Sequence, residues 1–312
     1  MKILIAYDGS ACATDAIQEL KNAYLPEDGV EARILAVGEV RSPTEPALNL
    51  DPSLPIVTFA MENVQDIIQY AREAAERDAE EGKLLLSKLF PKWNITVSIH
   101  LHSPASTILE VSETWKPDLI VMGSHGRGAL GRLFLGSVSL RVASESHASV
   151  RITRAKQERL SNATPAGSAP RILLAFDGSH SSSQAVHALL RRNWPTDTLL
   201  HIVTVIDVSI LATPEYIWLV GSDLGVYEEM KESHIGHALH SLEGEMKKRF
   251  AHVTTATPAG TPARELLEEA KQFHADTIFI GSRGLSRFKR MLLGSVANGV
   301  LSHAEATVEI VR

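Results

Sequence analysis

The chain has 312 residues, a length that suits two domains of about 150 residues better than one. Its hydrophobic content of 44% and charged content of 22% are ordinary for a globular protein, and its net charge of −6 argues against nucleic acid or an anionic membrane as the main partner. The single cysteine, Cys12, excludes a disulfide within the chain and favours a reducing, cytoplasmic setting. No apolar run approaches the roughly 20 residues of a membrane span, and Asp8 comes too early for a signal peptide.

Apolar segments rich in β-branched residues alternate with helical patterns along the chain. Strands are expected at 2–7, 32–37, 95–100, 118–122 and 149–153, and again at 171–176, 199–206, about 252–256, 276–280 and 307–311. Helices are expected between them, at 12–24, 60–90, 105–115 and 136–146, then at 182–193, 225–250, 262–273 and 294–303. This alternation is typical of βαβ units, so the predicted fold class is α/β, with a five-stranded parallel sheet covered by helices on both faces in each half.

The two halves are copies of one unit. KILIAYDGS at 2–10 pairs with RILLAFDGS at 171–179, and later segments also correspond. We therefore place the domains at 1–154 and 171–312, with the polar segment 155–170, rich in Ala, Gly and Pro, as the linker.

The copies differ in length, and each ends in a short β-rich run. Copy one is the longer because of the Pro-rich stretch 41–56 and the long helix after it. The last strands, 149–153 and 307–311, would form sheet edges. Since strand edges seek pairing, we expect them to lie against each other and to join the halves as a pseudo-dimer.

A glycine pattern of fixed spacing, G-x2-G-x9-G-S, follows the fourth strand of each copy. Its members are Gly123, Gly126, Gly136 and Ser137, then Gly281, Gly284, Gly294 and Ser295. Glycines let backbone N–H groups approach an anion closely, and the last part of the pattern opens a helix, whose N-terminus favours phosphate. The loops lack the lysine of a Walker A loop, and the first turns lack G-x-G-x-x-G. The pattern therefore predicts a phosphate site that belongs neither to a P-loop NTPase nor to a nicotinamide dehydrogenase.

An aspartate follows the first strand of each copy, Asp8 and Asp177. Ligands of open parallel sheets bind outside the carboxyl ends of the strands, so each aspartate would share one crevice with its glycine loop if the first and fourth strands are neighbours. Alternatives remain open. The glycines could serve only tight turns and packing, and the aspartates could merely cap the next helix. Ser137 and Ser295 could cap a helix or bond a phosphate, whereas Ser10 and Ser179 are expected to be caps. Arg127 could reach a phosphate or be solvated.

The whole pattern resembles the universal stress protein family, in its tandem form and its ATP-binding branch. The residues that carry the resemblance are AYDGS and AFDGS, DLIVMGSHGR and DTIFIGSRG, and the glycine pattern in both copies. The resemblance implies two Rossmann-like (adenine nucleotide alpha hydrolase-like) domains with the strand order 3-2-1-4-5. There is one departure: the family usually has glycine before the Pro-Ala pair that opens the third helix. Copy two keeps it in Gly260-Thr261-Pro262-Ala263, but copy one has Ser103-Pro104-Ala105.

The resemblance also implies roles for individual residues. Asp8 and Asp177 would help to hold the nucleoside, the backbone at Val37 and Val205 would contact adenine, and the motif glycines and serines would contact ribose and phosphates. The ligand would be ATP (or ADP or AMP), with Mg²⁺ held mainly by the phosphates. A homodimer and an unknown regulatory protein partner are expected.

The predicted function is that of a nucleotide-dependent stress-response regulator with two ATP sites. The alternative is a slow ATPase or a phosphoryl- or nucleotidyl-transferase that uses the same sites, and a third hypothesis is an interaction module with empty sites. Phosphoryl transfer needs a group that orients the nucleophile. His125 suits proton transfer, but copy two has Arg283 there, so no catalytic residue is assigned. A metal site at His234, His237 and His240 is disfavoured, since no carboxylate or cysteine partner is evident.

Overall fold

A computed structural model describes residues 1–39, 55–126, 135–154, 169–207, 234–284 and 293–312 of the chain. Most of the expected linker at 155–170 and most of the Pro-rich stretch at 41–56 lie outside these ranges.

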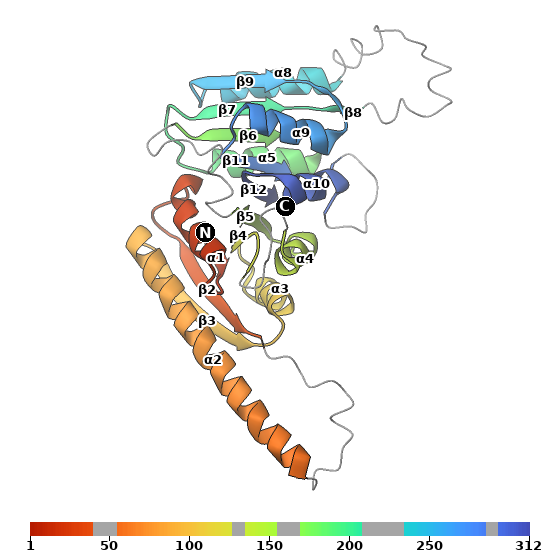
Figure 1. The fold of residues 1–312 in the computed structure, drawn as a ribbon. Helices are drawn as coiled ribbons and strands as arrows, with labels where there is room; N and C mark the ends of the chain where they lie inside the picture. Colours follow the sequence, from red (N-terminus) through yellow and green to blue (C-terminus); the bar gives the residue numbers. More distant parts are fainter. Residues whose placement is uncertain (40–54, 127–134, 155–168, 208–233, 285–292) are drawn as a thin grey trace, which may run out of the picture.

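Strands and helices alternate in both halves, as the sequence predicts (Figure 1). The first half contains β1 (Lys2–Ala6), α1 (Ala11–Glu19) with the 3-10 turn η1 (Leu20–Ala23), β2 (Glu31–Gly38), α2 (Pro55–Leu89), β3 (Asn94–Leu101), α3 (Pro104–Trp115), β4 (Leu119–Gly123), α4 (Ser137–Glu145) and β5 (Ser149–Thr153). The second half contains β6 (Arg171–Ala175), α5 (His180–Leu190), β7 (Leu199–Val203), β8 (Ile206–Asp207), α8 (His234–Met246), β9 (His252–Ala256), β10 (Ala259–Gly260), α9 (Pro262–Gln272), β11 (Thr277–Gly281), α10 (Ser295–His303) and β12 (Thr307–Val311).

The main strands form one continuous sheet in the order β3-β2-β1-β4-β5-β12-β11-β6-β7-β9. Pairs within each half are parallel, which confirms the prediction of two tandem α/β units. The halves meet where β5 and β12 pair in antiparallel fashion, with Ile152 opposite Val308 and Val150 opposite Ile310. The prediction that the last strands join the halves is therefore confirmed.

The predicted single strand at 199–206 is wrong in one respect. The chain leaves the main sheet after β7, and β8 pairs with β10 in a separate two-stranded ladder. At Thr204, just past β7, the backbone N–H still donates to the carbonyl of Ala256, and the side-chain hydroxyl donates to that of Phe176. Of the helix expected at 225–250, the part at 225–233 lies outside the described residues.

Alternate residues of the strands face two different cores. In β1, Leu4 faces α3 and α4, whereas Ile3 and Ile5 face α1 and α2. The core under α3, α4, α9 and α10 is continuous across both halves, because it contains Val150 and Ile152 of one half beside buried residues of the other. The two units therefore share one apolar core on this face.

The opposite face carries a buried ionic cluster at the junction of the halves. We call Arg151, Glu19, Glu309 and Arg192 the junction cluster. Arg151 is fully buried; its guanidinium donates to Glu19 at 2.9 Å, to Glu309 at 3.0 Å and to Thr277 at 3.2 Å. Arg192 donates to the second oxygen of Glu309 and to the carbonyl of Ala23. Two cations thus face two anions in a site that excludes water.

The junction cluster shows how burial and charge compete. Burial lowers the pKa of Arg151, but the carboxylates of Glu19 and Glu309 outweigh this and leave its pKa raised. For Arg192 burial dominates, and its pKa lies below the ordinary value. Arg151 is therefore held as a cation chiefly by its two partners.

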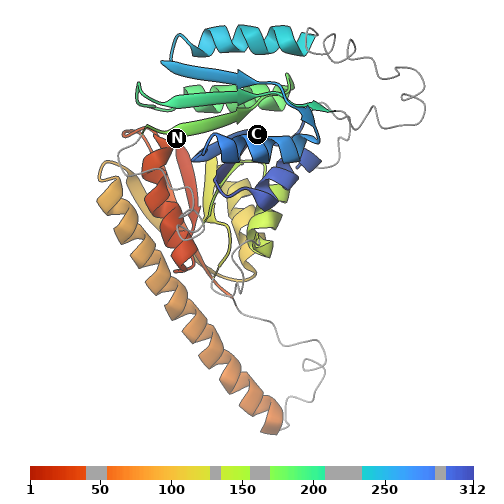
Figure 2. The same cartoon turned by 45° about the horizontal axis from the view of Figure 1, so that its top comes forward.

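Helix α2 runs beyond the sheet. Its 35 residues make it far longer than any neighbour, and both views show its first part extending past the ends of β2 and β3 (Figures 1 and 2). Ala71 marks the crossing point, since its carbonyl packs against Gly38, the last residue of β2. Exposed apolar side chains lie beyond it, Ile67 and Tyr70.

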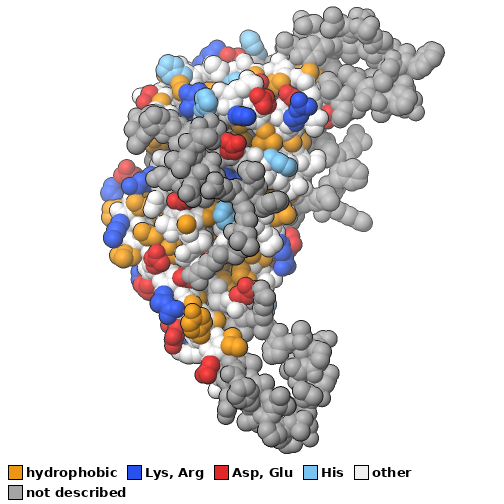
Figure 3. All heavy atoms as spheres, viewed as in Figure 1, with side chains coloured by type: hydrophobic (Ala, Val, Ile, Leu, Met, Phe, Trp, Pro, Cys, Tyr) orange, Lys and Arg blue, Asp and Glu red, His pale blue; other side chains and the backbone are white. Residues whose placement is uncertain are grey.

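Acidic and basic side chains are interspersed on the face seen in Figure 3. Within the described residues, no helix is both long enough and apolar enough to cross a bilayer.

Candidate functional site

The turn after the first strand of each copy is built by the sequence D-G-S. The backbone N–H of Ser10 donates to Asp8 Oδ1 at 3.0 Å, and Ser10 Oγ accepts from the N–H of Ala13 and so caps α1. Asp177 and Ser179 repeat both contacts at α5. The serine caps are confirmed. The aspartates do not cap the helices; each holds the turn through Oδ1.

Each aspartate faces the second glycine of its loop. Strand β1 lies between β2 and β4, so the turn at Asp8 and the loop after β4 meet at the carboxyl edge of the sheet. A Cβ on Gly126 would lie only 2.5 Å from Asp8 Oδ2, and one on Gly284 only 2.8 Å from Asp177 Oδ2. The loop backbone thus approaches the carboxylate as closely as glycine allows, at the same place in both copies.

The last glycine of each pattern is the cap residue of the following helix. Gly136 and Gly294 occupy the N-cap positions of α4 and α10, and neither helix has a side-chain cap. The interpretation of Ser137 and Ser295 as caps is therefore wrong, because each is the first helical residue. The first-turn N–H groups of such a helix have no partner within it and carry partial positive charge.

A backbone hydrogen bond connects the two ends of each glycine loop. The N–H of Gly136 donates to the carbonyl of Ser124 at 2.7 Å, and that of Gly294 donates to Ser282 at 2.7 Å. A Cβ on Gly136 would lie 3.2 Å from the Cα of His125. The helix N-terminus is therefore held beside the end of the fourth strand, on the same edge as the aspartate. Residues 127–134 and 285–292 lie outside the described residues, and with them Arg127.

The first glycine of each pattern has a packing role. A Cβ on Gly123 would lie 2.8 Å from the backbone of Cys12 in α1, and one on Gly281 would lie 2.6 Å from Ser181 in α5. These glycines let the helix lie directly on the strand. The hypothesis of a structural role therefore has direct support at this position of the pattern.

Replacing Gly123 with Ala is expected to lower the free energy of unfolding by about 1–3 kcal/mol, because helix α1 must move to admit the methyl group. Urea unfolding followed by circular dichroism measures the change. The control is Gly244→Ala in α8, where nothing lies within 4 Å and helix propensity should leave stability equal or raised. Equal midpoints for the two variants would contradict the packing role.

The residues expected near adenine lie at the carboxyl end of the second strand. Val37 is the penultimate residue of β2, half-buried against the shared core. Val205 follows β7 and packs against the same core. Both therefore stand at the edge that carries the aspartates and the loops.

One contact under the first loop is absent from the second. Ser124 is buried; its Oγ lies 3.0 Å from His125 Nδ1 and 3.4 Å from Cys12 Sγ. Cys12 is buried, as expected of a small packed residue, but it also accepts from the N–H of Ser124 at 3.2 Å. The second copy has Ser181 and Arg283 in place of Cys12 and His125. Only the alignment of the two repeats could have indicated this difference.

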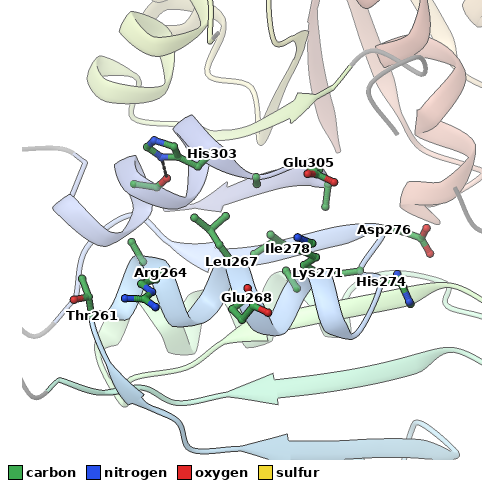
Figure 4. A pocket seen from close by; sticks show the side chains of 16 residues that line it. Thr261, Arg264, Leu267, Glu268, Lys271, His274, Asp276, Ile278, His303 and Glu305 are labelled. Atoms are coloured by element: carbon green, nitrogen blue, oxygen red, sulfur yellow. Dashed lines mark hydrogen bonds between the residues drawn. The ribbon is translucent and has the colours of Figure 1, made fainter. Parts of the chain in front are cut away.

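A separate groove lies between α9 and α10 (Figure 4). Its volume is about 520 Å³; Leu267 and Ile278 line its apolar floor, and charged residues such as Arg264, Lys271 and Glu305 line its rim. It lies along the flanks of the two helices, away from the place where Asp177 meets its glycine loop. Within the described residues, no three His, Cys, Asp or Glu side chains are grouped to hold a metal ion.

The fold and the site define a tandem α/β protein in which each unit places a carboxylate beside a glycine loop and an open helix N-terminus. The model of the universal stress protein family matches residues 1–154 and 169–312. The chain belongs to this family.

Some known relatives match most of the chain. A universal stress protein of Mycolicibacterium smegmatis is 28% identical over 266 residues, 84% of this chain and 82% of the relative. One of Mycobacterium tuberculosis is 26% identical over 223 residues, 71% of this chain and 70% of its own length. The crystal structure of a universal stress protein from Archaeoglobus fulgidus superposes with a TM-score of 0.61 at 22% identity, over 100% of this chain and 96% of that one. This last likeness concerns the fold.

Proposed function

We propose that this universal stress protein binds one adenine nucleotide in each half, at 1–154 and at 171–312, and that ATP is the ligand in both. The observation that carries the proposal is the duplicated contact between an aspartate and a loop glycine, beside a helix without a side-chain cap. A helix N-terminus of this kind favours phosphate, and a carboxylate next to it suits the hydroxyls of a ribose.

Different residues of each site bind different parts of the nucleotide. Asp8 and Asp177 accept hydrogen bonds from the nucleoside, and the backbone at Val37 and Val205 lies where the adenine edge would reach the second strand. The first-turn amides of α4 and α10, with the hydroxyls of Ser137 and Ser295, bind phosphate oxygens. Mg²⁺ is bound mainly by the phosphates, where it neutralises their charge.

The two sites support binding better than catalysis. His125 of the first loop is replaced by Arg283 in the second, so the copies share no titratable group suited to proton transfer near neutral pH. What they share is the aspartate, the glycines and the serine. We therefore propose a nucleotide-dependent regulator, in which bound ATP favours one conformation by differential affinity. Its proposed setting is a cytoplasmic homodimer with a regulatory protein partner.

Identification of the resident ligand tests the proposal. Protein purified from cells is denatured, and the released small molecules are separated by chromatography and detected by ultraviolet absorbance. We expect an adenine nucleotide, ATP or its hydrolysis products. Release of a flavin or NAD, or no adenine compound even after incubation with ATP, would contradict the proposal. Turnover well above background that is lost in His125→Ala would favour an enzyme instead.

A further inference from the structure

The last residue of each half reaches into the other half. Arg154 follows β5, and its Nη2 donates to the carbonyls of Leu301 at 2.7 Å and Ser302 at 3.2 Å, in the last turn of α10. Arg312 follows β12, and it donates to the carbonyl of Ala143 in α4 and to that of Ala148 just beyond it. The two arginines occupy the same position of the repeat, so the exchange is reciprocal.

These arginines are charged groups placed at the negative ends of helices. Arg154 is only 4% exposed. Burial, and to a lesser degree the charge of Arg283, lowers the pKa of Arg312 to about 10, so it remains a cation at neutral pH. The last carbonyls of a helix lack partners within the helix and carry partial negative charge, so a cation that bonds to them holds that end in place.

The same two segments also contact the glycine loops. The N–H of Ser124, which follows Gly123, donates to the carbonyl of Thr153 at 2.9 Å, one residue before Arg154. The N–H of Ser282 donates in the same way to Val311 at 2.9 Å, one residue before Arg312. The loop of the first half is therefore bonded to the residue before Arg154, which holds α10 of the second half. The loop of the second half is bonded in the same way to the residue before Arg312, which holds α4 of the first half.

The helices held in this way are the ones that open the candidate phosphate sites. Helix α10 begins at Ser295 in the second site and ends at the carbonyls bound by Arg154. Helix α4 begins at Ser137 in the first site and ends at the carbonyl bound by Arg312. Both helices have only nine residues, so fixing one end fixes the other.

We propose that Arg154 and Arg312 are crossed positioning residues: each secures the phosphate-binding helix of the opposite half, so that nucleotide affinity in one half depends on the arginine of the other. This inference rests on the proposed function, since it concerns the regulation of the same sites. It links the two sites through the junction of β5 and β12, without any contact between the nucleotides.

The two directions of this link are unequal. In the first half, Arg141 Nη1 donates to Ser106 Oγ at 3.1 Å and so braces α4 against α3. The repeat has Gly299 at the position of Arg141, and α10 packs closely on α9 there, since a Cβ on Gly299 would lie 2.8 Å from that of Ala263; the groove of Figure 4 runs along α10 beside Gly299 and His303. Arg154 bonds two carbonyls of α10, whereas Arg312 bonds one carbonyl of α4, so the contribution of Arg154 exceeds that of Arg312.

The test uses proteins with a single open site. Gly126→Val closes the first site and Gly284→Val the second, because each places a branched side chain against the aspartate. In the Gly126→Val protein, Arg154→Met is expected to weaken ATP binding about fivefold, and Arg312→Met less than twofold. In the Gly284→Val protein the order reverses, with about threefold weakening by Arg312→Met. Titration calorimetry measures the affinities.

Two further measurements separate positioning from stability. Arg154→Lys keeps the cation and is expected to recover most of the affinity; it also carries the test if the Met variant does not fold. Hydrogen exchange without nucleotide is expected to be faster in Arg154→Met than in the parent protein at the hydrogen-bonded amides of α10, beginning with Asn298, whose N–H donates to Gly294. Weakening only in the arginine's own half, or equal weakening in both halves, would overturn the inference. Failure of the parent protein to bind ATP would instead overturn the proposed function.

Discussion

Replacing Arg151 with Met is expected to lower the free energy of unfolding by about 3–5 kcal/mol. The substitution removes the cation paired with the carboxylate of Glu19, which is 4% exposed, and one of the two cations paired with Glu309, which is 1% exposed. Removing one partner of a buried ion pair costs the desolvation of the charge that remains. Urea unfolding monitored by circular dichroism gives the change directly.

The control for this variant is Lys92→Met. Lys92 pairs with Glu27 at 3.4 Å, but both side chains are more than half exposed, so its loss is expected to cost at most about 1 kcal/mol. The double variant Arg151→Met, Glu19→Gln is expected to be less destabilised than the sum of the single changes, because the two groups interact directly. Similar costs for Arg151→Met and Lys92→Met would show that the junction cluster does not hold the halves together.

The second expected result is a change in binding stoichiometry. Gly126→Val should reduce the ATP bound per chain from two to one, and Gly284→Val should do the same at the other site. The new Cβ would lie 2.5 Å from Asp8 Oδ2 in the first case and 2.8 Å from Asp177 Oδ2 in the second. The carboxylate must turn away and the loop must lift, which removes the ribose contact and displaces the phosphate-binding backbone together.

Gly244→Val serves as the matched control, since Gly244 lies in α8 with nothing within 4 Å of its added Cβ. It should bind two ATP. The double variant Gly126→Val, Gly284→Val should bind none. If either single variant still binds two ATP with unchanged affinity, that loop does not form part of a nucleotide site.

The sequence was sufficient to predict the parts that depend on local pattern and on duplication. Alternating apolar segments indicated the parallel sheet, and the repeat of D-G-S and of the glycine pattern predicted that Asp8 and the loop at 123–137 face one crevice if the first and fourth strands are neighbours, as they are. The reason is topological, because the carboxyl ends of neighbouring parallel strands share one edge. The edge character of β5 and β12 likewise predicted that they would pair.

The contacts across the junction could not be predicted in this way. Arg151 and Glu19 are separated by 132 positions, and Arg154 and Leu301 by 147. An arginine in a short terminal strand is equally compatible with an exposed edge, but here β5 pairs with β12 and Arg151 is fully buried. The sequence also could not assign a separate role to each glycine of the pattern. In the structure, Gly123 allows close packing of α1, Gly136 is the N-cap residue of α4, and Gly126 lies beside the carboxylate of Asp8.

The central claim is that both halves bind ATP at the aspartate and the glycine loop. Titration calorimetry of the unmodified protein, stripped of resident nucleotide and supplied with Mg²⁺, tests it most directly. Two ATP per chain are expected, falling to one in each of Gly126→Val and Gly284→Val. No binding by the stripped protein, or two ATP in both variants, would contradict the claim.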